Sequence, residues 1–221
     1  MNNEAANSLA DLKAQCKPDP AKIFKEVKEV ALNPVGCWNN VRGTYGTIKE
    51  YYLNFLAPLA LIPAVVTFIN VSIIGTSILV PTQNGGGGIS LTPEIHRFGI
   101  VSGFISALVQ FIVGLLMQYV FAFILGKVAV KFNGNDDVFS ALKLAGYAAS
   151  PVALLTVLEI LPMGVLLVGL VGLYSLYIFY QGISPMLSVP AEKRVVYSAV
   201  SIGACFVAAI IIAGIRGVFH I

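Results

Sequence analysis

Residues 98–126 have the sequence FGIVSGFISALVQFIVGLLMQYVFAFILG, in which Asp, Glu, Lys and Arg are absent. A helix needs roughly 20 mostly apolar residues to cross a bilayer, so this stretch is long enough to span with some tilt. Four further stretches are free of charge in the same way: 51–93, 144–158, 160–191 and 195–215. Hydrophobic residues make up 57% of the chain and charged residues 11%, against about 25% charged in soluble domains. We therefore predict an all-α integral membrane protein.

The uncharged stretches divide the chain into two parts. Residues 51–221 form a membrane domain of five spans, expected at about 52–74, 98–126, 139–158, 163–185 and 195–215. Residues 1–50 form a polar N-terminal segment. Four consecutive glycines at 85–88 favour a flexible turn between the first two spans.

The N-terminal segment contains one amphipathic pattern, at residues 20–32. Pro20 follows Asp19, a suitable cap, and occupies the first turn, where proline is well tolerated. Apolar residues then recur at helical spacing, with Lys and Glu on the other side: Ile23, Phe24, Val27, Val30 and Ala31. Such a helix lies on the membrane surface or packs on the protein's own cytoplasmic face, and the sequence leaves both arrangements open.

The basic residues predict the orientation, because cytoplasmic loops carry an excess of Lys and Arg. With five spans, one side carries the N-terminal segment and five basic loop residues: Lys127, Lys131, Lys143, Lys193 and Arg194. The other side carries Arg97 and Arg216. We expect the N-terminus to be cytoplasmic and the C-terminus to lie outside.

Several motifs spread over about 30–200 resemble those of the Yip (Ypt/Rab-interacting protein) domain family: LNP followed by Trp38, YLNFLAPLALIPAV, FSALKLAGYAASP, GLYSLYIFYQGI and PAEKRVVYS. The resemblance implies a five-helix membrane domain with a cytosolic N-terminus. The short N-terminal segment resembles the bacterial branch, which implies a bacterial inner membrane. Eukaryotic members of the family are linked to Rab GTPases and vesicle traffic, but bacteria have no Rab system, so the resemblance implies the fold more firmly than the function.

The sequence contains few side chains in patterns typical of catalysis or metal binding. The motifs of α/β-hydrolases, zinc proteases and phosphate loops do not occur, and the three cysteines show no C-x-x-C spacing. We expect no catalytic residue, no metal and no cofactor. The net charge of +3, without a basic run interleaved with aromatic residues, also argues against a nucleic-acid partner.

Tyrosines and other polar residues on two neighbouring spans form the main candidate site. Tyr174, Tyr177 and Gln181 follow one another at spacings of three and four, which places them on one helix face. Tyr147 and Ser150 lie on the third span, which a short turn at 159–164 makes the antiparallel neighbour of the fourth. We predict a polar seam between the two helices, which either locks the bundle or holds a lipid headgroup or a partner segment.

Glu159 is a second candidate, as an acid near a membrane boundary without a basic neighbour. An ionisable group within lipid is a functional candidate by default, although a position at a span end also suits an ordinary interfacial acid. Small residues at four-residue spacing, such as Gly99 with Gly103, let helices approach closely. They serve packing within the bundle or contact in a homo-oligomer.

These observations favour a non-enzymatic protein. The first hypothesis is a membrane organiser or adaptor that acts through lipids or through a protein partner at its cytoplasmic face. The alternative is a passive transporter, channel or lipid-moving protein that uses a groove between helices. Midplane charges and an internal repeat, typical of ion-coupled carriers, are missing from the sequence.

Overall fold

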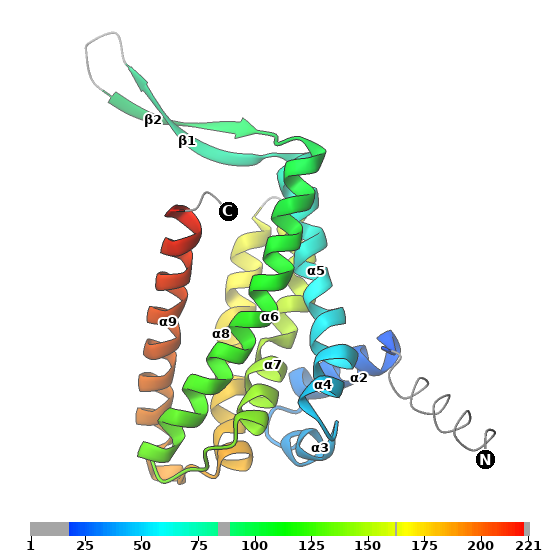
Figure 1. Ribbon diagram of the computed structural model, residues 1–221, viewed down its shortest axis with the longest axis vertical. Helices are drawn as coiled ribbons and strands as arrows, with labels where there is room; N and C mark the ends of the chain where they lie inside the picture. The colour runs from blue at the N-terminus through cyan, green and yellow to red at the C-terminus, as the bar shows by residue number, and fades with distance from the viewer. Residues whose placement is uncertain (1–17, 84–88, 162, 219–221) are drawn as a thin grey trace, which may run out of the picture.

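The computed structural model describes residues 18–83, 89–161 and 163–218. Five helices in this part of the chain are long and apolar enough to cross a membrane, and they run side by side along the long axis of the molecule (Figure 1). Four of them contain one long α-helix each: α6 (Ile100–Lys131), α7 (Val138–Leu155), α8 (Gly164–Leu187) and α9 (Arg194–Val218). The prediction of five long apolar helices is confirmed.

The first span is built from four consecutive helical pieces: α4 (Ile48–Tyr51), a π-helical turn η1 (Tyr52–Leu56), α5 (Ala57–Phe68) and a second π-helical turn η2 (Ile69–Ile74). Pro58 and Pro63 lack the N–H that a helix needs, and η1 ends just before Pro58. Thr67 donates from Oγ1 to the Pro63 carbonyl oxygen at 2.9 Å. The wider turn η1 accommodates Pro58, whereas the Thr67 bond goes to the carbonyl of Pro63 itself and does not replace the bond to Leu59 that Pro63 cannot make.

A β-hairpin follows the first span, which the sequence did not predict. Strand β1 (Thr76–Gln83) pairs antiparallel with β2 (Ile89–His96), so that Thr76 lies opposite His96. Gly75 joins η2 to β1 with φ of +95°, and a Cβ there would lie 2.6 Å from the Ile95 side chain, so the position requires glycine. The predicted glycine turn at 85–88 lies outside the described residues. The hairpin extends beyond the bundle (Figure 1), and we call this end the hairpin end.

Two short helices from the N-terminal segment, α2 (Pro20–Leu32) and α3 (Trp38–Gly43), lie at the opposite end of the bundle, which we call the α2 end (Figure 1). The largest fully buried side chains lie in this half, among them Trp38, Tyr51, Tyr147 and Tyr197. Gly182 of α8 admits Trp38, since a Cβ at 182 would lie 2.5 Å from the indole ring. The N-terminal segment is thus part of the folded core.

Short connections join α7, α8 and α9. Two 3-10 turns, η3 (Thr156–Ile160) and η4 (Ala191–Lys193), join α7 to α8 at the hairpin end and α8 to α9 at the α2 end. Lys193 donates to Asn133 Oδ1 at 3.0 Å, and the Tyr197 hydroxyl donates to the Leu125 carbonyl oxygen at 3.0 Å. These bonds tie the loop after α6 and the start of α9 together.

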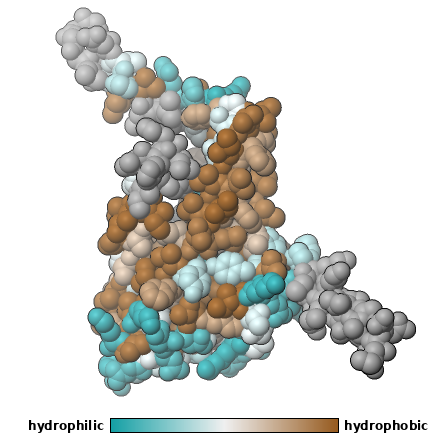
Figure 2. Space-filling view, viewed as in Figure 1, coloured by the Kyte–Doolittle hydropathy of each residue, from teal (hydrophilic) through white to brown (hydrophobic). Residues whose placement is uncertain are grey.

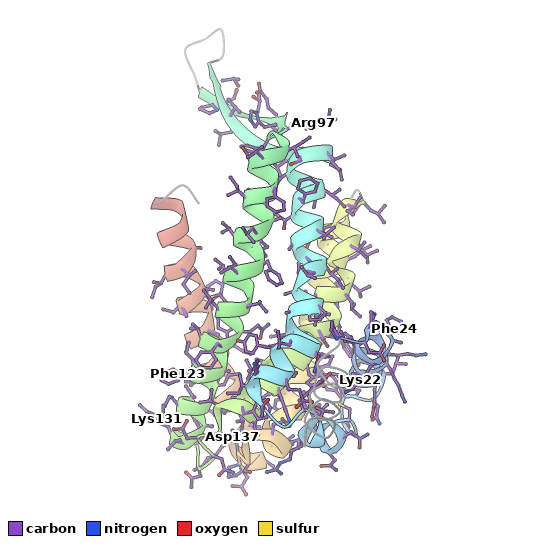
Figure 3. The ribbon with its side chains drawn as sticks, turned by 45° about the vertical axis from the view of Figure 1, so that its right-hand side comes forward. Lys22, Phe24, Arg97, Phe123, Lys131 and Asp137 are labelled. Atoms are coloured by element: carbon purple, nitrogen blue, oxygen red, sulfur yellow. The ribbon has the colours of Figure 1, made fainter. Side chains whose placement is uncertain are left out.

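The surface divides into a wide hydrophobic belt between two hydrophilic ends (Figure 2). Lys131 and Arg97 mark the two ends of α6 in Figure 3. The basic residues Lys127, Lys193 and Arg194 belong to the α2 end, together with the N-terminal segment. The separation of basic residues that the five-span scheme predicts is therefore present in the fold.

Candidate functional site

Helix α2 begins and packs as its sequence dictates. The Asp19 side chain accepts a hydrogen bond from the Ala21 N–H at 2.9 Å, and Pro20 fills the first turn. Ile23, Val27 and Val30 are buried in the common core. Phe24, however, is 60% exposed, so it does not share the core face of Ile23 and Val27. The apolar residues of α2 divide into a core face and a second, exposed flank.

Glu26 lies on the core face of α2, where only 14% of its side chain is exposed. Its Oε2 accepts hydrogen bonds from the Tyr147 hydroxyl at 2.7 Å and the Tyr45 hydroxyl at 3.2 Å. The Lys22 ammonium lies 3.9 Å from Oε1. Bonds to an ionised acceptor are stronger than neutral ones, so Glu26 attaches α2 to α7 and to the α3–α4 connection.

Tyr45 and Thr44 complete this arrangement from the α3–α4 connection. The Thr44 Oγ1 lies 3.3 Å from the Tyr147 hydroxyl oxygen. Burial, and then the neighbouring Glu26 carboxylate, raise the pKa of Tyr45 well above its ordinary value. The phenol therefore stays protonated and serves as a donor to Glu26.

Lys143 of α7 is 3% exposed and holds the end of α3. Its ammonium donates to the carbonyl oxygens of Arg42 at 3.2 Å and Tyr45 at 3.1 Å, and also to that of Thr44. A helix C-terminus leaves carbonyls without helical partners and carries partial negative charge. Lys143 thus uses its three donors on carbonyls that would otherwise be buried unpaired. We call Glu26, Thr44, Tyr45, Lys143 and Tyr147 the Glu26 cluster.

An aromatic layer lies beside the Glu26 cluster. The rings of Phe55 and Tyr147 have centroids 4.3 Å apart, and those of Tyr51 and Phe55 stack at 5.3 Å. Gly146 of α7 lets Tyr51 approach, because a Cβ there would collide with its hydroxyl. This packing excludes water from the polar groups and makes their hydrogen bonds stronger.

The structure divides the predicted polar seam between the core and the surface. Tyr147 and Ser150 are fully buried, and the Ser150 hydroxyl donates to the Tyr147 carbonyl oxygen at 2.7 Å. Tyr174 and Tyr177 lie side by side with ring centroids 5.9 Å apart, and are 40% and 44% exposed. Gln181 is partly buried one turn further along α8.

Tyr174 has a different partner from the predicted one. Its hydroxyl donates to the Ala31 carbonyl oxygen in the last turn of α2, at 2.7 Å. Tyr147 donates to Glu26 of the same helix. Helix α2 lies across α7 and α8. The hydroxyls of Tyr147 and Tyr174 therefore donate to α2 and not to each other.

Glu159 lies in η3 at the hairpin end and is partly exposed, far from the Glu26 cluster. The acid that matters for the geometry, Glu26, was not selected from the sequence. The sequence could have indicated this position, because residue 26 falls next to Val30 on a helical wheel, at the edge of the face that contains Ile23 and Val27. Lys143 likewise lies within the buried stretch of α7 but was counted only as a basic residue of a loop.

The acidic loop before α7 is a helix cap. Asp137 accepts from the N–H groups of Phe139 at 3.0 Å and Ser140 at 3.2 Å, and from the Ser140 hydroxyl at 2.6 Å. Burial alone would raise the pKa of Asp137, but these hydrogen bonds outweigh it and lower the pKa. Asp136 pairs with Lys127 at 2.5 Å. Among the described residues, no group of three His, Cys, Asp or Glu side chains gathers to hold a metal ion.

The fold and the site define a multi-pass α-helical membrane protein whose N-terminal amphipathic helix is hydrogen-bonded to the bundle. The family model for the Yip1 domain matches residues 28–212, and the chain belongs to that family. The match includes the last turn of α2, Lys143 and Tyr147 of the motif ALKLAGYAASP, the first four spans and nearly all of the fifth. No curated protein and no solved structure matches the chain.

Proposed function

We propose that the protein is a non-enzymatic membrane organiser, in which α2 is a fixed wedge in one leaflet of the bilayer. The observation that carries this proposal is the division of α2 into three faces. One face is the core face described above. The remainder has an apolar flank, formed by Phe24, Ala31 and Leu32 with Val35 just beyond the helix, and next to it a polar flank, formed by Lys22, Lys25 and Glu29. On a wheel of 100° per residue, Lys28 falls between Phe24 and Leu32 on the apolar flank.

The apolar flank is unusually exposed for so many large side chains. Phe24, Leu32 and Val35 are 60%, 73% and 66% exposed. Figure 3 places Phe24 on the side of α2 nearer the hairpin end and Lys22 on the other side. The apolar flank therefore faces the hydrophobic belt, and the polar flank faces the hydrophilic end of the molecule. That is the orientation of a helix lying in the membrane interface.

The depth of α2 supports the same placement. Tyr174 lies thirteen residues before Leu187, the last residue of α8, which corresponds to about 20 Å along the helix. Its hydrogen bond to Ala31 therefore holds the end of α2 well above the hydrophilic end of the bundle. The helix lies across the bundle axis (Figure 1), so it adds volume at the level of one leaflet.

The Glu26 cluster explains how the wedge is kept in place. The bonds of Glu26 and Lys143 fix α2 and α3 to α7, whereas a typical interfacial helix is attached only by its chain. We place the α2 end in the cytoplasm, since Lys127, Lys131 and Lys193 gather there. The exposed Lys22 and Lys25 then face the cytosol beside the anionic headgroups, where a protein partner also has access.

Reconstitution tests the proposal. The double variant Phe24→Ser, Leu32→Ser removes the apolar flank, and Lys25→Ser, Glu29→Ser is the matched change on the polar flank. At equal protein density, the wild type and the polar-flank variant should give smaller, more curved proteoliposomes than the apolar-flank variant, as sized by electron cryomicroscopy. Equal vesicle sizes for all three proteins, with equal incorporation, would overturn the proposal.

A further inference from the structure

A cavity of about 340 Å³ lies among α6, α7, α8 and α9. Ligand sites in proteins have volumes of roughly 300–1,000 Å³, so the cavity is large enough for part of a ligand. Its walls are almost wholly apolar and include Phe121, Ala148, Leu176, Phe179, Ile202 and Phe206. None of these residues belongs to α2, so the cavity is independent of the proposed wedge.

The cavity opens toward the bilayer. Leu176 and Phe206 line it and are nevertheless 44% and 66% exposed. Helix α9 stands at the edge of the bundle and leans away from α6 toward its C-terminal end, in both Figure 1 and Figure 3. An occupant therefore enters sideways from the hydrophobic belt.

Two hydroxyls in the cavity wall, those of Ser175 and Ser201, lack a hydrogen-bond partner among the described residues. Ser175 is 8% exposed, and its Oγ is buried without a hydrogen-bond partner among the described residues. A buried hydroxyl without an acceptor costs free energy, and helix serines ordinarily bond to the carbonyl four residues earlier. Ser175 therefore has a donor available for an acceptor that enters the cavity.

Arg194 provides a further unfilled donor, toward the α2 end of the bundle. Its guanidinium lies 4.9 Å from the centroid of the Tyr180 ring, and its Nε is buried without a hydrogen-bond partner among the residues that the structure describes. Tyr180 follows Leu176 by four residues, and Arg194 precedes Ser201, another wall residue, by seven. Both positions therefore continue the walls of the cavity along α8 and α9.

We propose that the groove so formed binds one phospholipid, with an acyl chain in the cavity and the phosphate on Arg194. The guanidinium is the side chain best suited to phosphate oxygens. Ser175 lies five residues deeper along α8 than Tyr180, about 8 Å by helix rise, and donates to an ester carbonyl. A helix from a second copy of the chain fits less well, since its carbonyls are bonded internally and leave both donors unpaired.

Lipid retention measured by native mass spectrometry tests the site. The protein is purified in mild detergent and titrated with phosphatidylglycerol. The wild type should retain one phospholipid per chain, and Arg194→Gln should weaken binding at least tenfold. Arg97→Gln is the matched control at the hairpin end and should bind as the wild type does. Arg194→Lys keeps the charge without the planar guanidinium group. Its affinity for phosphatidylglycerol should lie between those of the wild type and Arg194→Gln.

Two further measurements separate the alternatives. Diacylglycerol lacks the phosphate and should compete poorly for the wild type. Ala209→Phe fills the cavity and should abolish retention with unchanged helicity; if this variant does not fold, the Arg194 series decides alone. Equal retention by Arg194→Gln and Arg97→Gln, equal competition by diacylglycerol, or a lipid-free dimer crosslinked through the groove would overturn the proposal.

Discussion

Replacing Tyr147 with Phe tests the Glu26 cluster most selectively. The change removes one oxygen and keeps the ring, whose contact with Phe55 at 4.3 Å should persist. It deletes the 2.7 Å bond to Glu26 and the 3.3 Å contact with Thr44. A hydrogen bond to a charged group contributes about 1.5–3 kcal/mol. For a chain of this size, each kcal/mol corresponds to roughly 2–4 °C in Tm, which predicts a decrease of several degrees.

Tyr174→Phe is the matched control for this substitution. Its hydroxyl also donates to α2 at 2.7 Å, but the acceptor is a neutral carbonyl and the side chain is 40% exposed. The expected loss is about 0.5–1.5 kcal/mol. Both variants are compared by thermal unfolding in nanodiscs, followed by circular dichroism. Tyr147→Phe should also couple with Glu26→Gln: the double variant should lose less stability than the sum of the losses in the two single variants. An equal or smaller loss for Tyr147→Phe than for Tyr174→Phe would refute the reasoning.

Three further substitutions test other parts of the structure. Lys143→Met leaves buried carbonyls unpaired and should cost about 1–3 kcal/mol for each, measured as Tm; an unchanged Tm would contradict the bonding to α3. Gly182→Ala places a methyl group 2.5 Å from Trp38 and should cost about 1–3 kcal/mol, whereas Gly172→Ala, with open space around it, should be neutral. Asp137 has a pKa lowered from its ordinary value of 3.8, so its stabilisation is fully present well above that pH and is lost as the pH falls through the lowered pKa. In a series of Tm against pH, Asp137→Asn should show a smaller loss of stability in acid than the wild type.

The spans could be predicted because charge-free stretches report burial in lipid directly. Two features escaped the same reasoning for physical reasons. The hairpin strands are short apolar runs next to a span, where hydropathy does not distinguish a strand from a helix. Phe24 and Val27 look equivalent on the helical pattern, but only the packed structure shows that one faces the core and the other the surface.

The polar contacts were the least predictable part. The sequence indicated that Tyr147 and Tyr174 need partners for their hydroxyls, which is correct. It placed those partners on the neighbouring span, because the N-terminal segment was treated as a separate cytoplasmic unit. The acceptors are Glu26 and the Ala31 carbonyl, more than 100 positions away in the chain, and a single sequence carries no signal for such a pairing.

The position of α2 in the membrane is the central claim, and spin labels measure it directly. Labels are placed at Phe24→Cys or Lys22→Cys in a chain with Cys16 and Cys205 replaced by Ser. Cys37 can remain, since it is fully buried and burial raises the pKa of its thiol to about 11. In nanodiscs, the label at 24 should collide mainly with oxygen, which concentrates in the bilayer, and the label at 22 mainly with a water-soluble nickel chelate. Equal collision with the nickel chelate at both positions would contradict the account.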